Sequence, residues 1–256
     1  MKHITSSTET VVPDDGTNRK LHIRRWGAGE RTALLIHGLG SSGVTWKALA
    51  KRLAEDGYTV YAPDLPGHGR SARETQYSVL KWAELLSEHY PQVDLLVGHS
   101  IGALIATQLQ HKLVPTHTVL VDPVLRLPGK GLRRTTQTIF KYFQYSYGRL
   151  HRKHTIIRTQ TSQWDTRTVK ALLIPETVTV ISKPTLVLRS RYSYIAPMKL
   201  RTLLTTIRTV TIPKAGHNIH KDNFPATWAA IKEFISLPAA ITEPLETLLP
   251  GKIAVN

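Results

Sequence analysis

The chain has 256 residues, of which 41% are hydrophobic and 20% charged, so it is long enough to bury a full core as one domain. This composition excludes an intrinsically disordered or fibrous protein. Cysteine is absent, which excludes disulfide scaffolds, thiolate catalysis and cysteine-based metal sites.

The formal net charge of +16 suggests a polyanionic partner, such as nucleic acid or an anionic membrane surface. Residues 1–19 are polar and lack the apolar core of a signal peptide. No segment approaches the roughly 20 apolar residues that a membrane span requires. We therefore expect a cytoplasmic protein.

Short apolar runs alternate with amphipathic segments along the chain. The patterns predict strands at 32–36, 58–62, 93–97, 119–121, 185–188 and 209–212, and helices at 80–89, 103–113 and 226–235. Continuous apolar strands that alternate with helices are typical of a parallel sheet covered on both faces. Ligands bind at the carboxyl ends of such strands, where the Gly, His, Ser and Asp residues of this chain collect.

The segment Gly98-His99-Ser100-Ile101-Gly102 directly follows one predicted strand and directly precedes a predicted helix. It fits the pattern Gly-x-Ser-x-Gly, in which a serine occupies a tight turn and small neighbours let the backbone pass close by. Alone, this pattern is also compatible with an ordinary glycine-bounded turn. Its position between a strand and a helix favours Ser100 as a nucleophile.

Four motifs, in this order, make the chain resemble the α/β-hydrolase fold superfamily. They are His37-Gly38-Leu39-Gly40, Asp64-Leu65-Pro66-Gly67-His68-Gly69-Arg70-Ser71, the Gly98 to Gly102 turn and Ala215-Gly216-His217. The resemblance covers about residues 21–234. It implies a three-layer α/β-hydrolase fold, with a mostly parallel sheet, helices on both faces and a helical cap.

The resemblance also implies a capped serine esterase or lipase-like enzyme that cleaves a carboxylic ester through an acyl-enzyme on Ser100, with no cofactor and no metal. The superfamily further contains thioesterases, lactonases and carbon–carbon hydrolases, so an enzyme acting on those bonds stays an alternative. By the same resemblance, the backbone N–H groups of Leu39 and Ile101 bind the oxyanion. His68 and His99 match residues that shape the pocket.

The base must be an imidazole within hydrogen-bond reach of the Ser100 hydroxyl. His217 lies in a glycine-containing loop after the last predicted strand, and its motif and its final place in the order favour it. His220 is the alternative base, and would otherwise be a polar residue at the start of the last helix.

The acid departs from the commonest pattern of the family. Residues 189–216 contain no Asp or Glu, and Tyr194 stands where a relative would carry Asp. If the order serine, acid, histidine holds, three acids remain, which are Asp122, Asp165 and Glu176.

We expect Asp122 to orient His217, because Asp122 ends a predicted strand and some family members supply their acid from that strand. Asp64 is a weaker candidate, since its loop is a recurrent structural feature of the family and precedes Ser100. Alternatively, Asp122 only terminates its strand, and the protein is a Ser–His enzyme or a hydrolase-fold protein that binds or signals with a degraded triad.

The connection at 123–183 is far longer than the few residues that ordinarily join elements of an α/β sheet. We expect one domain over residues 1–256 in which this connection is an inserted cap, placed over Ser100 by the resemblance. The insertion contains 12 Lys and Arg against 2 acids, so it carries +10 of the +16.

These cap charges either attract an anionic substrate or a membrane surface, or face water. An anion or membrane binder driven by charge alone is a further alternative. Nucleic-acid binding is not expected as the main function, because no recognised nucleic-acid fold is visible. The expected partner is a small ester-like molecule.

Overall fold

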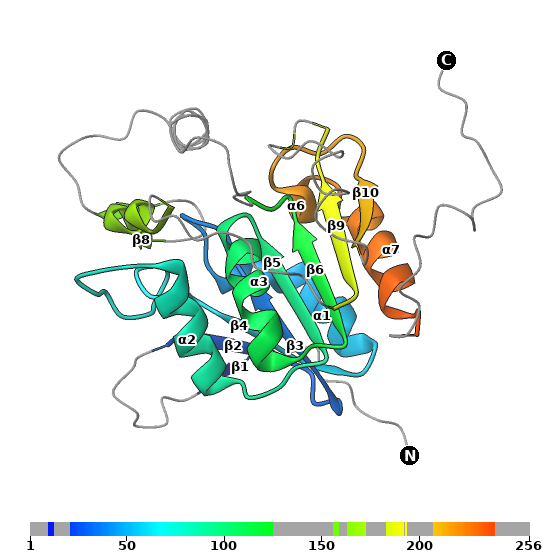
Figure 1. Ribbon diagram of the computed structural model, residues 1–256, viewed down its shortest axis with the longest axis horizontal. Helices are drawn as coiled ribbons and strands as arrows, with labels where there is room; N and C mark the ends of the chain where they lie inside the picture. Colours follow the sequence, from blue (N-terminus) through cyan, green and yellow to red (C-terminus); the bar gives the residue numbers. More distant parts are fainter. Residues whose placement is uncertain are drawn as a thin grey trace.

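The computed structural model describes residues 10–12, 21–124, 156–158, 163–172, 183–191, 193 and 207–238. Its centre is an eight-stranded sheet in the order β1-β2-β4-β3-β5-β6-β9-β10 (Figure 1). The strands are β1 (Thr10–Val12), β2 (Ile23–Trp26), β3 (Arg31–Ile36), β4 (Tyr58–Pro63), β5 (Leu95–His99), β6 (His117–Val121), β9 (Thr185–Arg189) and β10 (Ile207–Thr211). From β4 to β10 every pair is parallel, whereas β1 and β2 join antiparallel at one edge.

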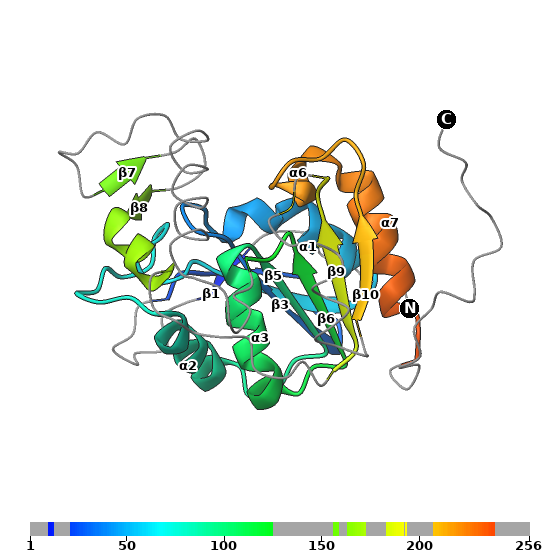
Figure 2. The ribbon, with the colours of Figure 1, turned by 45° about the horizontal axis from the view of Figure 1, so that its top comes forward.

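Helices cover both faces of this sheet (Figures 1 and 2). On one face lie α2 (Val79–His89) and α3 (Ile101–Leu113). On the other lie the 3-10 helix η1 (Gly43–Trp46), α1 (Lys47–Glu55), α6 (Ile219–Asp222) and α7 (Phe224–Ile235). The prediction of a three-layer fold with a mostly parallel sheet is therefore confirmed.

Two separate cores hold these layers together, because successive side chains of a strand point to opposite faces. In β5, Leu96 packs with α2 and α3, while Leu95 and Val97 pack with α1 and α7. All three side chains are fully buried. This alternation places His99, two residues beyond Val97, on the side of α6 and α7.

The sequence patterns do not predict β1 and β2, the two antiparallel strands at one side of the sheet. Arg24 and Arg25 interrupt the apolar pattern of β2, so periodicity does not reveal that strand. The Arg24 side chain is nevertheless buried, because its Nη1 contacts Asp64 Oδ1 at 2.6 Å. A buried ion pair thus replaces the apolar residue that the pattern would require.

The described part of the insertion, which was expected to be a helical cap, contains two strands as well as a helix. There, β7 (Ile156–Arg158) and β8 (Gln163–Asp165) pair antiparallel and precede the 3-10 helix η2 (Thr166–Leu172). Figure 2 shows this pair beside the sheet rather than within it. Most of residues 123–183, with most of their basic side chains, lies outside the described residues.

Main-chain hydrogen bonds fix β8 to the loop that follows β4. Gly69 donates its N–H to Gln163 O at 2.7 Å, and Asp165 donates to Gly67 O at the same distance. The Trp164 side chain is fully buried and stacks on His68, with ring centroids 6.1 Å apart. His68 is thus a packing residue between the Pro-Gly loop and the insertion.

Candidate active site

Ser100 lies in the sharp turn between β5 and α3. Its φ of 55° and ψ of −116° fall in a region that costs a residue with a side chain about 1–3 kcal/mol. A Cβ on Gly98 would lie 2.2 Å from Gly102 O, and a Cβ on Gly102 would lie 2.4 Å from Ile36 O. Glycine is therefore required on both sides of this turn.

Backbone hydrogen bonds attach the turn to the end of the neighbouring strand β6. Ser100 donates its N–H to Val121 O at 3.0 Å, and Val124 donates to Ser100 O at 3.3 Å. Asp122 follows Val121 directly, so the same bonds bring the segment that carries this carboxylate next to the Ser100 turn.

The Asp122 carboxylate is 1% exposed and accepts hydrogen bonds on both oxygens. His217 Nδ1 lies 2.7 Å from Oδ2, and Ser190 donates its N–H to Oδ1 at 3.1 Å. The Asp122 backbone has a φ of 38° and donates to Leu188 O at 2.7 Å. The aspartate at the end of β6 therefore reaches the histidine after β10 across β9.

Burial by itself would raise the pKa of Asp122. Hydrogen bonds from His217, from the Ser190 N–H and from Ser193 favour the charged form and outweigh burial, so the pKa lies below its ordinary value. Asp122 is therefore an anion at neutral pH. The negative carboxylate faces His217 and accepts a hydrogen bond from its ring. This contact favours the tautomer of His217 that carries a proton on Nδ1.

His220 does not contact Asp122. It is buried in α6, where its Nε2 lies 2.8 Å from Thr45 Oγ1 and its ring packs on Trp46 with centroids 4.5 Å apart. Burial first, and then the charges of Lys221 and His217, lower the pKa of His220 to about 3. The side chain is thus a neutral, buried residue in the first turn of the short helix α6, which directly precedes α7.

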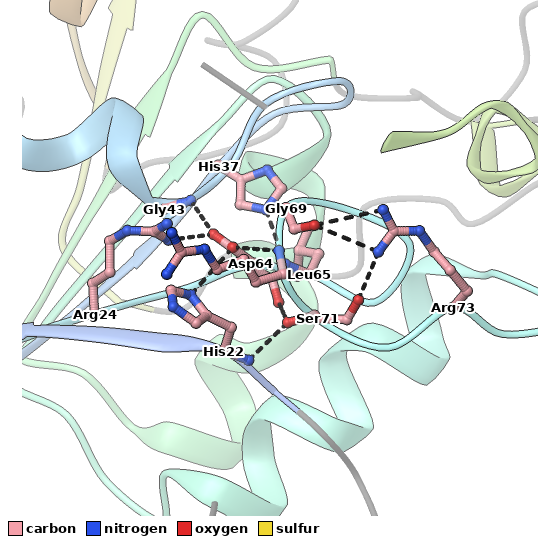
Figure 3. A network of polar contacts seen from close by, with 10 residues as sticks. His22, Arg24, His37, Gly43, Asp64, Leu65, Gly69, Ser71 and Arg73 are labelled. Carbon is pink, nitrogen blue, oxygen red and sulfur yellow. Dashed lines mark hydrogen bonds and ion pairs between the residues drawn. The ribbon is translucent and has the colours of Figure 1, made fainter. Parts of the chain in front are cut away.

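Asp64 is also buried, but in a separate network (Figure 3). Its Oδ1 accepts hydrogen bonds from Arg24 Nη1 at 2.6 Å and from Gly43 N–H at 2.7 Å. Its Oδ2 accepts from Arg70 N–H at 2.9 Å and lies 3.3 Å from His22 Nδ1. These contacts give Asp64 a structural role in holding the loops after β3 and β4.

The other candidate acid that the structure describes is Asp165. Both of its oxygens contact Arg167, and Tyr77 donates to Oδ2 at 3.2 Å. Glu176 and Tyr194 lie outside the described residues.

A buried imidazole fixes the loop that carries Leu39. Leu65 donates its N–H to His37 Nε2 at 2.9 Å (Figure 3). His37 therefore carries its proton on Nδ1, which donates to Gly38 O at 2.8 Å. Burial lowers the pKa of His37, so this ring is neutral. Because C=O and N–H of one peptide unit point in opposite directions, the bond to Gly38 O turns the Leu39 N–H away from His37.

Ile101, the other expected donor of the oxyanion site, is the first residue of α3. The first N–H groups of a helix have no acceptor within the helix and carry a partial positive charge. Leu39 and Ile101 themselves are 5% and 1% exposed. Both residues that are expected to supply the backbone donors are thus buried.

Ser190, Ser193 and the hydrogen-bonding role of His37 are not predicted from the sequence. Ser190 and Ser193 belong to the segment that is conspicuous for lacking an acid. Serines in this segment could indicate from the sequence that the acid comes from another strand, since their hydroxyl and N–H donors would stabilise that carboxylate.

Among the described residues, no group of three or more His, Asp or Glu side chains is arranged to hold a metal ion. No helix in the described part of the chain is long and apolar enough to cross a membrane.

Curated relatives match part of this chain. It is 40% identical over 106 residues to a pimeloyl-[acyl-carrier protein] methyl ester esterase of Vibrio cholerae, covering 41% of this chain and 41% of that protein. It is 33% identical over 126 residues to the lipase LipV of Mycobacterium tuberculosis, covering 46% and 48%. The chain thus matches less than half the length of these relatives.

Solved structures match nearly the whole fold. A thioesterase domain from the curacin biosynthetic pathway aligns with a TM-score of 0.61 at 24% identity, covering 90% of this chain and 98% of that domain. The epoxide hydrolase CorEH aligns with a TM-score of 0.66 at 15% identity, covering 90% and 98%. The model of the alpha/beta hydrolase family matches residues 33–231, and the chain belongs to this family.

Proposed function

We propose that the protein is a serine hydrolase that cleaves a carboxylic ester through an acyl-enzyme on Ser100. The observation that carries this proposal is the 2.7 Å contact between Asp122 and His217 beside a serine held in a strained turn between a strand and a helix. Nucleophile, base and acid then come from the carboxyl ends of separate strands, where ligands bind in such sheets.

In this proposal His217 removes the proton from the Ser100 hydroxyl as that oxygen attacks the ester carbonyl. The contact with Asp122 supports it, because an Nδ1–H bonded to Asp122 leaves the lone pair of the neutral ring on Nε2. The protonated ring then gives its proton to the departing alcohol. Water, activated by the same ring, releases the acid from Ser100.

The backbone N–H groups of Leu39 and Ile101 bind the negative oxygen that forms during attack. The Leu39 donor is pre-oriented by the His37 bond to the Gly38 carbonyl, and the Ile101 donor by its place at the start of α3. Pre-oriented donors need no rearrangement when the charge develops, so each contributes to the rate.

The insertion at 123–183 acts as a cap over the substrate in this proposal. The bonds from β8 to Gly67 and Gly69 support it, as does the packing of Trp164 against the backbone near Gly40. The substrate class is a small carboxylic ester, in keeping with the names of the esterase and lipase relatives. An acid partner for His217 favours turnover over a binding role with a degraded triad.

The direct test is hydrolysis of 4-nitrophenyl butyrate by the wild-type protein and by Ser100→Ala. The wild type should turn over and the variant should lose at least about 10³-fold in kcat, because removal of a triad member leaves only binding and oxyanion stabilisation. Equal rates for the two proteins would refute the proposed function.

A further inference from the structure

His99, the last residue of β5, lies between the two loops that the proposed reaction depends on. Its side chain is buried, and its Nε2 lies 2.8 Å from the backbone oxygen of His217. On its other side, a Cβ on Gly38 would lie 2.7 Å from His99 Nδ1, so the ring packs directly against the loop that carries Leu39.

The hydrogen bond to His217 fixes the protonation of His99. A carbonyl oxygen only accepts hydrogen bonds, so Nε2 of His99 must carry the proton and donate it. Burial, and then the neighbouring rings of His220 and His217, lower the pKa of His99 well below its ordinary value, so Nδ1 is unprotonated. A neutral ring with its proton on Nε2 is the form that this contact requires.

The His99 bond holds a different part of His217 from the Asp122 bond. Asp122 contacts the ring at Nδ1, whereas His99 contacts the backbone oxygen. Gly216 donates to Asp222 Oδ2 at 2.9 Å, which attaches the loop to α6 and not to the strand that carries Ser100. The His99 bond, by contrast, joins the backbone of His217 to the strand that carries Ser100.

We infer, on the basis of the proposed function, that His99 is a positioning residue, which fixes the separation of His217 and the Gly38 loop from Ser100 by donating a hydrogen bond to the His217 carbonyl. It transfers no proton and touches no reacting atom. Its effect is geometric, and a displacement of the base by about 1 Å is enough to lower a rate about 10²-fold.

Neutrality of His99 is part of this role, because its ring centroid lies 4.7 Å from that of His217 and 4.7 Å from that of His220. A cationic His99 would oppose the imidazolium that His217 becomes during the reaction. Among the described residues, the charged groups around this cluster include Asp122, which contacts His217, and Lys221, which neighbours His220. Asp222 is a further one, since it accepts the Gly216 N–H.

The test compares two substitutions of similar volume. His99→Gln keeps an N–H donor of similar reach, whereas His99→Leu removes it. We expect His99→Leu to lower kcat for 4-nitrophenyl butyrate about 10²-fold with KM changed by less than about threefold. His99→Gln should recover kcat to within about tenfold of the wild type, since it restores the donor.

His117→Leu is the matched control, because His117 is also a buried histidine whose Nε2 contacts a backbone oxygen, that of Leu237 at 3.1 Å. It lies at the opposite end of the parallel strands, at the start of β6. This control should lower the thermal midpoint about as much as His99→Leu and leave kcat unchanged. Equal losses of kcat in His117→Leu and His99→Leu would overturn the inference, because the effect of His99 would then be one of overall stability and not of positioning.

A second measurement does not depend on turnover or on the stability of the leucine variant. Nitrogen-15 NMR of the imidazoles in the wild type at pH 7 should show His99 protonated at Nε2 alone. A proton on Nδ1 of His99 would overturn the inference, even if esterase activity were absent. Conversely, if Ser100→Ala abolishes hydrolysis while His99→Leu keeps the wild-type kcat, the proposed function stands and the inference fails.

Discussion

The Asp122→Asn substitution perturbs the proposed mechanism at one atom and leaves the shape of the site unchanged. In the structure, Oδ1 of Asp122 accepts the Ser190 N–H at 3.1 Å, and Oδ2 accepts from His217. An asparagine must keep its oxygen toward the Ser190 N–H, because an amide NH2 there would face another donor. Its NH2 group therefore points at His217 Nδ1.

That NH2 group changes which nitrogen of His217 carries the proton. Facing a donor, Nδ1 becomes the acceptor, so the proton moves to Nε2, and the ring no longer offers a lone pair to the Ser100 hydroxyl. Loss of the correct form of the base by such a substitution costs about 10⁴-fold in kcat. This loss corresponds to about 5.5 kcal/mol of transition-state stabilisation.

Kinetics with 4-nitrophenyl butyrate at pH 7.5 provide the measurement, and circular dichroism verifies that the variant is folded. Asp165→Asn is the control, because Asp165 is a buried carboxylate on β8 that pairs with Arg167. It should keep kcat within about tenfold of the wild type. The reasoning is refuted if Asp122→Asn also retains kcat within tenfold.

Three further predictions concern stability. Gly102→Ala should lower the free energy of unfolding by about 3 kcal/mol, because its Cβ would lie 2.4 Å from a backbone oxygen; an unchanged thermal midpoint would contradict the packing. Arg24→Met should cost about 3 kcal/mol in urea unfolding, since it leaves the buried Asp64 carboxylate without its arginine; an unchanged urea midpoint would contradict this. His220 has a folded-state pKa of about 3 against 6.5 unfolded, so the unfolded state binds more protons and stability falls as pH drops below 6.5. His220→Gln should reduce this slope between pH 4 and 5.5 by about 1.4 kcal/mol per pH unit, and an unaltered slope would contradict the burial of a neutral ring.

Local patterns predict the elements around the site well. The apolar runs of β5 and β6 predict strands, and the glycines around Ser100 predict the sharp turn that the structure contains. In both cases the residues that determine the local structure lie within a few positions of one another in the sequence. Burial on two faces demands continuous apolar residues, and close backbone approach demands glycine.

Contacts between distant residues are harder to predict. Arg24 belongs to a strand that periodicity does not reveal, since the partner that allows its burial is 40 residues away in sequence. Asp122 can be predicted from the sequence by elimination of other acids. The hydrogen-bond donors of Ser190 that stabilise its carboxylate cannot. The bond from His99 to His217 joins residues 118 positions apart, and no local pattern encodes it.

Covalent labelling of Ser100 reports directly on whether its hydroxyl is activated. A fluorophosphonate reacts with a serine hydroxyl that a neighbouring base activates, and peptide mass spectrometry identifies the modified residue. We expect one adduct, on Ser100, that forms rapidly in the wild type and much more slowly in Asp122→Asn. An unlabelled Ser100 in folded wild-type protein, or an equal rate of labelling in the two proteins, would contradict the account.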